Sequence, residues 1–208
     1  MRETDVTGLL REGLLEGVSV VLAAAPQPDQ TRDRFGTAVR DSCGELGAGV
    51  FECRVSSFGD APVQEQAAEA ALAAALEELG GASVLVIDGA SLFGASEGRQ
   101  ALVSTLEASW NVVRSLANAA FLPENRGGRV LLLAPPPNAG ELTDGVRAGL
   151  ENLARTLSIE WARYGVTIVT IALGSETDPS EVGALVAYLA SPAGSYFSGC
   201  LLDLRGPG

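Results

Sequence analysis

The chain has 208 residues, of which 26 are acidic, 14 are basic and none is histidine, so its formal net charge is −12. This length suits one domain, 1–208, with ample room for an apolar core. The acidic balance argues against nucleic acid and anionic membranes as partners, because both bind basic patches. Without histidine, the chain cannot carry a Ser-His-Asp triad and lacks the commonest metal ligand, so we expect no metal site.

The three cysteines, Cys43, Cys53 and Cys200, lack the close spacing of a metal site. We interpret them as reduced thiols of a cytoplasmic protein rather than as a disulfide or a zinc site. The N-terminal stretch does not have the pattern of a signal peptide, and no apolar window reaches the length of a membrane span. The sequence therefore predicts a cytoplasmic protein without a membrane segment.

Short apolar runs alternate with longer helical patterns along the chain, after a polar and partly helical lead-in at 1–16. Runs without polar alternation are typical of strands buried on both faces. Six strands are expected, at 18–25, 49–55, 83–88, 129–134, 166–172 and 200–204. Five helices are expected between them, at 35–46, 62–79, 97–121, 144–164 and 179–190. This alternation predicts an α/β fold, a doubly wound Rossmann-type parallel sheet with helices on both faces.

The clearest pattern is the helix at 144–164 followed by a buried strand. Its apolar residues recur at the spacing of one helix face: Val146, Leu150, Leu153, Leu157, Trp161 and Tyr164. Thr143 or Asp144 is expected to cap the start, and Glu151 and Arg155 lie one turn apart. Gly165 follows the last apolar position, where a left-handed residue ends a helix most easily.

The order of these elements resembles that of the short-chain dehydrogenase/reductase family. The stretch at 148–174, AGLENLARTLSIEWARYGVTIVTIALG, is similar to the interface helix of that family and the strand after it. Shorter similarities lie at 127–133 (GGRVLLL), at 83–90 (SVLVIDGA) and in the C-terminal SYFSGCLLDLRG. The resemblance implies a Rossmann-type fold and a family of NAD(P)-dependent oxidoreductases.

The proton-transfer positions of the family are altered. Active members carry Tyr-x-x-x-Lys just before the interface helix, and counting back places Arg147 at the Lys and Thr143 at the Tyr. A Thr hydroxyl is too weak an acid to replace an activated phenol, and a guanidinium does not reproduce the geometry of an ammonium. The position of the catalytic Ser falls in 134–138, APPPN, which has no hydroxyl. Asn111 stands near the family's helix Asn, and we interpret it as structural.

The cofactor loop departs from the family as well. Only Gly36 matches the glycine-rich motif, and the preceding 26–33, PQPDQTRD, carries two prolines and two acidic residues that disfavour phosphate. Arg32, within this loop, and Arg34 could offset the acidic charge. Asp88 stands where active members have Asn-Asn-Ala-Gly, and we interpret it as a strand-end residue that hydrogen-bonds the turn. The sequence therefore predicts that no NAD(P) is bound.

The long substrate loop of active members is also absent, because 175–178 runs straight into the helix near Pro179. The proton-transfer pair, the catalytic Ser, the cofactor loop and the substrate loop are thus all altered. Together these four changes predict a catalytically inactive subunit. Such a subunit would pair with itself or with an active family member through 97–121 and 144–164, with Leu157, Trp161 and Tyr164 as interface candidates. The alternative that the two rings pack within the monomer stays open. By family analogy alone, the active partner would act on ketoacyl or hydroxyacyl thioesters.

Two further hypotheses remain. The chain could be an NAD(P)-dependent oxidoreductase with a non-standard site built from Asp88, Thr143 and Arg147. It could also be a module that binds a small ligand in the crevice at the carboxyl ends of the strands.

Overall fold

The computed structural model describes residues 10–26, 34–55 and 61–205. Within them, six parallel strands form one sheet in the order β2-β1-β3-β4-β5-β6. The strands are β1 (Ser19–Ala24), β2 (Gly49–Arg54), β3 (Val84–Asp88), β4 (Gly128–Ala134), β5 (Val166–Ala172) and β6 (Cys200–Asp203). Each was predicted from its apolar run to within one residue, because strands covered on both faces carry almost no polar residues.

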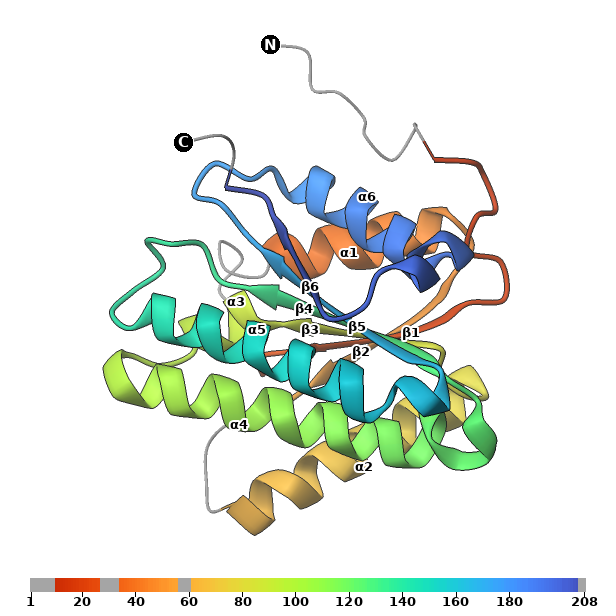
Figure 1. Cartoon of the computed structure of the whole chain (residues 1–208), viewed down its shortest axis with the longest axis horizontal. Helices are drawn as coiled ribbons and strands as arrows, with labels where there is room; N and C mark the ends of the chain where they lie inside the picture. Colours follow the sequence, from red (N-terminus) through yellow and green to blue (C-terminus); the bar gives the residue numbers. More distant parts are fainter. Residues whose placement is uncertain (1–9, 27–33, 56–60, 206–208) are drawn as a thin grey trace.

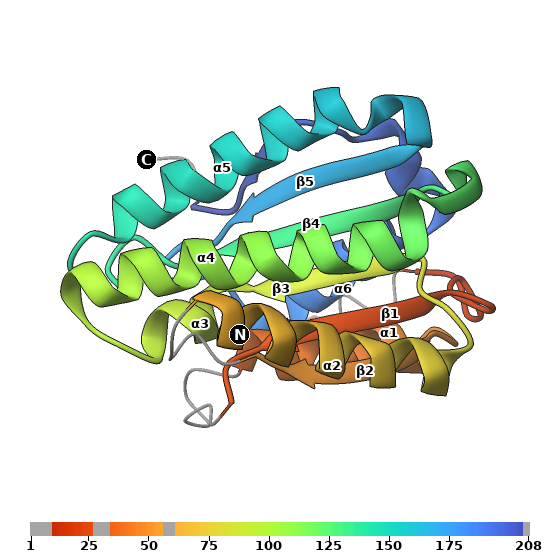
Figure 2. The ribbon, with the colours of Figure 1, turned by 90° about the horizontal axis from the view of Figure 1, so that it is seen from below.

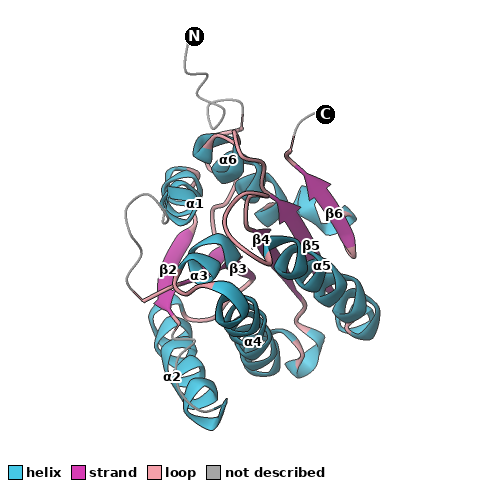
Figure 3. Cartoon of the chain, turned by 90° about the vertical axis from the view of Figure 1, so that its left-hand side faces the viewer, coloured by secondary structure: helices cyan, strands magenta, loops and turns pink. Residues whose placement is uncertain are grey.

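Helices cover both faces of this sheet, as Figures 1 and 3 show. Two helices, α1 (Arg34–Glu45) and α6 (Pro179–Ala190), pack together on one face. Three helices, α2 (Ala61–Leu79), α4 (Gly98–Leu116) and α5 (Thr143–Glu160), cover the other (Figure 2). Alternate strand residues therefore enter two separate cores: Val21 and Leu85 face α2, α4 and α5, whereas Val20 and Val84 face α1 and α6. The predicted doubly wound Rossmann-type architecture is confirmed.

Several helix boundaries differ from the prediction. The helix expected at 97–121 is α4, which passes into a π-helical turn at Ala117–Phe121. The described part of the lead-in, 10–16, forms turns instead of the expected partial helix. Two short elements were not predicted, the helix α3 (Gly89–Gly94) and a 3₁₀ turn at Pro192–Tyr196.

The helix expected at 144–164 has a different beginning and a different end. Its predicted cap is wrong, because Leu142 precedes the helix in a left-handed conformation (φ 64°) and Thr143 already belongs to it. The helix ends at Glu160, and a 3₁₀ turn at Ala162–Tyr164 leads to Gly165 (φ 74°), the predicted left-handed residue. Glu151 and Arg155, which the sequence placed one turn apart, form an ion pair at 2.6 Å.

Helices α4 and α5 lie side by side and run in the same direction (Figure 2). Gly145 and Gly149 of α5 face Leu102 and Leu106 of α4. A Cβ on Gly149 would lie 2.7 Å from Cδ2 of Leu106, so the glycine allows the close approach of the two helices. No described helix is both long and apolar enough to cross a membrane.

Candidate functional site at the carboxyl edge of the sheet

The carboxyl ends of the strands form the edge where this fold class binds ligands. Arg147, in the second turn of α5, lies between the ends of β4 and β5. Its Nη1 donates hydrogen bonds to the carbonyl oxygens of Pro135 and Leu173, the second at 2.9 Å. Burial lowers the pKa of the Arg147 guanidinium, Arg205 lowers it further, and Asp203 and Asp144 oppose the shift. The guanidinium thus ties α5 to the ends of two strands.

Thr143 lies one helical turn before Arg147, so the two side chains share a face of α5. The Thr143 side chain is buried, and its hydroxyl donates to the carbonyl oxygen of Gly140 at 2.6 Å. The structure therefore brings together the two residues that the resemblance placed at the Tyr and Lys positions. The Thr143 hydroxyl and Nη1 of Arg147 both donate to backbone carbonyls of their own chain.

Asp88 ends β3 and is fully buried. Its Oδ1 accepts a hydrogen bond from the backbone N–H of Ser91 at 3.0 Å, and Asp88 is the N-terminal cap of α3. The Ser91 hydroxyl donates to the Asp88 carbonyl (2.9 Å) and accepts from the N–H of Ala25, the residue after β1 (3.2 Å). The predicted turn-bonding role of Asp88 matches this geometry, and Ser91 is a partner that the sequence reading missed.

The remaining predicted site residues do not join this group. Asn111 lies five residues beyond Leu106 and is level with Ala154, about 10 Å along the helix axis from Arg147. Gly36 is buried in the first turn of α1, and the loop before it, 27–33, lies outside the described residues. The carboxyl edge therefore unites Thr143, Arg147 and Asp88 but not Asn111.

The phenols of the chain lie at the opposite, amino edge of the sheet. Tyr164 precedes β5, Tyr188 is in the last turn of α6, and Tyr196 ends the turn that leads to β6. All 14 basic residues are arginines, and the 208 residues contain no lysine. A Tyr-x-x-x-Lys pair is therefore excluded at every alignment register, not only at the counted positions.

Two described groups at the carboxyl edge that a nicotinamide dinucleotide could contact are already engaged within the chain. Such a cofactor needs free backbone donors after β1 and a cation for its ribose. Here the N–H of Ala25 is bonded to Ser91, and its carbonyl oxygen accepts from Nη1 of Arg54 at 3.1 Å. Arg147 is engaged with carbonyls of β4 and β5. The described part of the chain also holds no group of three His, Cys, Asp or Glu residues that could bind a metal ion.

Two cavities open near this edge. The smaller one, about 190 Å³, lies between α5 and β6 and contains Arg147, Glu151 and Arg205 among its lining residues. The larger one, about 300 Å³, lies between the α3–α4 turn and the loop after β4. Glu97 and Glu141 contribute carboxylates to the larger cavity, which gives it the charge to receive a small cation or a hydroxyl-rich ligand.

The predicted interface residues are less exposed than expected. Leu157 is only 2% exposed and belongs to the core, so its assignment to an interface is corrected. Trp161 and Tyr164 are half-buried and pack against the same core. Ile159 of α5 is 79% exposed and Trp110 of α4 is 40% exposed. These two apolar residues lie off the core stripe of their helices, which is the signal that could have found them.

Neither a protein-family model nor a curated protein sequence matches the chain significantly. Solved structures do match its fold. The citronellol catabolism dehydrogenase of Pseudomonas aeruginosa aligns with a TM-score of 0.65 and 19% identity, over 94% of this chain and 96% of that one. A double variant of a short-chain dehydrogenase/reductase from Serratia marcescens aligns with a TM-score of 0.68 and 17% identity, over 91% and 96%.

A hydroxysteroid dehydrogenase from Escherichia coli aligns with a TM-score of 0.64 and 18% identity, over 94% of this chain and 99% of that one. At such identities the likeness defines the fold alone. The chain therefore has the Rossmann-type fold found in short-chain dehydrogenases/reductases.

Proposed function

We propose that this chain is a catalytically inactive subunit with the short-chain dehydrogenase/reductase fold, which acts by assembling with a second copy or with an active family member. The observation that carries this proposal is the engagement of Arg147 with the carbonyls of Pro135 and Leu173. The position that holds an ammonium in active members is here a structural tie between α5 and the sheet.

The carboxyl edge offers neither of the two groups that proton transfer in this fold requires. A reductase of this fold needs an acid that can protonate a developing alkoxide and a cation that lowers the pKa of that acid. The Thr143 hydroxyl is a far weaker acid than a phenol and already donates to Gly140. The chain offers neither lysine nor histidine to assist it. These points support the absence of dehydrogenase turnover.

Turnover is tested with both reduced and oxidised nicotinamides and a panel of ketoacyl and hydroxyacyl thioesters. The proposal expects no substrate-dependent change in nicotinamide absorbance. Turnover in the wild type that is lost in Arg147→Ala but retained in Arg155→Ala would contradict it. Arg155 is a suitable control because it is an exposed arginine of the same helix, and its ion pair among the described residues is with Glu151.

The outer surface of α4 and α5 supports an assembly role. Trp110 and Ile159 expose large apolar side chains there, and an aromatic anchor of this kind is enriched at protein interfaces. By the resemblance, these are the helices through which family members pair. Burial of Trp110 against a partner would contribute about 2 kcal/mol or more to association.

We include a cytoplasmic location in the proposal, since the cysteines in the described chain are free thiols.

Sedimentation velocity tests assembly, with wild type, Trp110→Ala and the control Tyr196→Ala. Tyr196 is 90% exposed but lies outside the two helices, so its truncation should leave association unchanged. Trp110→Ala should weaken association by roughly thirtyfold or more. A wild type that remains monomeric alone and with every co-purifying family member would remove the assembly role.

A second candidate function is binding of a small ligand in the cavity of about 300 Å³ at Glu97 and Glu141. Its volume is at the lower limit of ordinary ligand sites. A thermal-shift screen of small amines and polyols against wild type and Glu141→Gln tests this alternative. Stabilisation of wild type that is absent in the variant would favour it over the assembly role.

A further inference from the structure

A cationic pocket lies at the amino edge of the sheet, opposite to the crevice described above. Arg129 is the second residue of β4, and its register partners are Val84 on β3 and Thr167 on β5. Because side chains alternate along a strand, Arg129 and Thr167 point to the face that α1 and α6 cover, as Leu131 does. The Arg129 guanidinium therefore lies at the end of the otherwise apolar core between the sheet and the helices α1 and α6.

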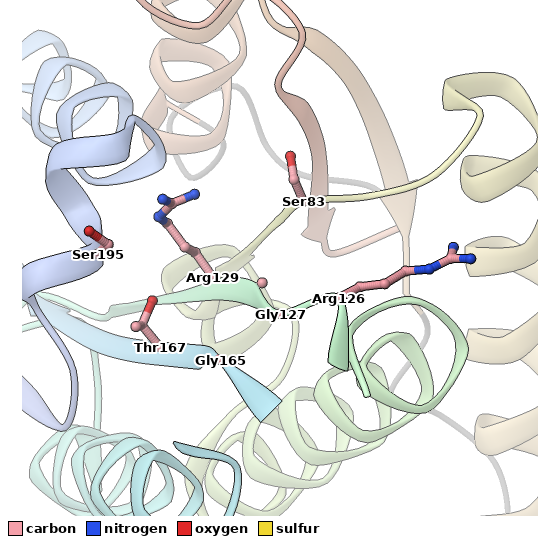
Figure 4. Close-up of a pocket in the computed structure, with 8 residues that line it drawn as sticks. Ser83, Arg126, Gly127, Arg129, Gly165, Thr167 and Ser195 are labelled. Atoms are coloured by element: carbon pink, nitrogen blue, oxygen red, sulfur yellow. The ribbon is translucent and has the colours of Figure 1, made fainter. Parts of the chain in front are cut away.

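The pocket has a volume of about 210 Å³ and is built from the amino ends of three strands and the turn before β6. Its lining includes Ser83, Arg126, Arg129, Gly165, Thr167 and Ser195. Figure 4 shows the Arg129 side chain pointing into the space between Ser83 and Ser195. Arg126, Gly165 and Ser195 are exposed, so the pocket opens to solvent.

The Arg129 guanidinium lacks a protein acceptor in the described part of the chain. Its Nε is buried without a hydrogen-bond partner, and no described carboxylate forms an ion pair with it. Burial alone lowers the pKa of Arg129, with no acidic group opposing the shift. A partly buried cation without a partner is costly, and an anion in hydrogen-bonding position removes most of that cost.

The other polar groups of the pocket are mostly committed. Arg126 donates to Glu124 at 3.0 Å and extends away from the pocket in Figure 4. The Ser83 hydroxyl donates to Ser19, and the Ser195 hydroxyl donates to Pro192. Thr167 makes no side-chain hydrogen bond to the described residues. Two donors therefore remain for a ligand, the Arg129 fork and the Thr167 hydroxyl.

We propose that this pocket binds a small oxyanion, the phosphate or carboxylate group of a ligand, through the Arg129 guanidinium with the Thr167 hydroxyl as second donor. A guanidinium fork matches two oxygens of either group. The volume admits one such group with a short substituent and excludes a dinucleotide. The proposal concerns the edge away from Arg147 and stands independently of the proposed function.

Calorimetric titrations with inorganic phosphate, sulfate and succinate, at constant ionic strength set with chloride, test the pocket and distinguish the two anion types. We expect saturable binding of at least one anion by wild type. Arg129→Met, which keeps the length of the side chain, should lose at least about tenfold in affinity. The control Arg126→Gln should bind within about twofold of wild type, because Arg126 is already paired with Glu124.

A second readout is the thermal stability of the protein, measured without anion and then with it. Without anion, Arg129→Met should be as stable as wild type or more stable, because it removes an uncompensated cation. Phosphate or succinate should then raise the melting temperature of wild type only. Absence of saturable binding by all three anions would overturn the proposal. A loss of stability in Arg129→Met without anion would also overturn it, since Arg129 would then serve the fold.

Discussion

Arg147 and Arg129 offer a comparison between the two edges of one sheet. Both are partly buried, and burial lowers the pKa of both guanidinium groups. Arg147 donates to two backbone carbonyls at the carboxyl edge, whereas Arg129 has no acceptor among the described residues at the amino edge. Nη1 of Arg147 serves the fold, whereas the Arg129 guanidinium keeps its donors available for a ligand.

The largest loss of stability is expected on substitution of Arg147. Arg147→Met should lower the free energy of unfolding by about 3 kcal/mol, because two buried carbonyls lose charged donors. Urea denaturation measures this loss, with Arg155→Met as the control for an exposed pair worth about 0.5 kcal/mol or less. A change at Arg147 no larger than that of the control would mean that its guanidinium is free for another role.

Substitution of Trp161, which follows α5, distinguishes a role in the monomer core from a role in an interface. Trp161→Ala should cost about 2 kcal/mol of monomer stability, since the half-buried ring packs against the core. Its association should match that of wild type, the reverse of the pattern expected for Trp110→Ala. Chemical denaturation combined with sedimentation velocity separates the two effects. Association weakened by Trp161→Ala at unchanged stability would return Trp161 to the interface.

The buried thiol of Cys43 makes the stability of the protein depend on alkaline pH. Burial raises the pKa of Cys43 to about 12. The unfolded chain releases this proton near pH 9 while the folded chain keeps it, so stability falls as pH rises above that value. Between pH 9 and 10.5 the loss should be about 1.5 kcal/mol. Cys43→Ala should show a correspondingly flatter dependence, and an equal slope in both proteins would show that Cys43 does not titrate as described.

The smallest effect is expected at Arg129. Arg129→Met should change the free energy of unfolding by less than about 0.5 kcal/mol without anion, or raise it. The contrast between this value and that of Arg147→Met measures the difference between the two edges directly. Equal losses at both positions would remove the distinction.

The sequence predicted the sheet well because both faces of each strand are buried and leave a continuous apolar run. It also placed Gly165 and the role of Asp88 correctly, since both follow from local backbone geometry. The tie of Arg147 to Pro135 and Leu173 was not predictable, because it depends on β4 and β5 lying next to each other. The pocket at Arg129 had one local signal, a single charged residue in GRVLLLA, but its isolation from acids is a tertiary property.

The helix caps show a second limit of sequence reading. Thr143 has the residue type of a cap, yet the chain enters the helix through a left-handed Leu142, and the Thr143 hydroxyl bonds back to Gly140. Trp161 and Tyr164 continued the apolar spacing, so the helix was predicted one turn too long. The spacing continues because a 3₁₀ turn presents the same side chains to the core.

On the proposal made above, the carboxyl edge of the sheet does not bind a nicotinamide dinucleotide. Titration calorimetry of the purified protein with NADH and NADPH, carried to millimolar nucleotide, is the decisive measurement. We expect no heat of binding beyond that of dilution for either nucleotide, in wild type and in Arg147→Met alike. Saturable binding with micromolar affinity would contradict it and would favour an oxidoreductase with a non-standard site.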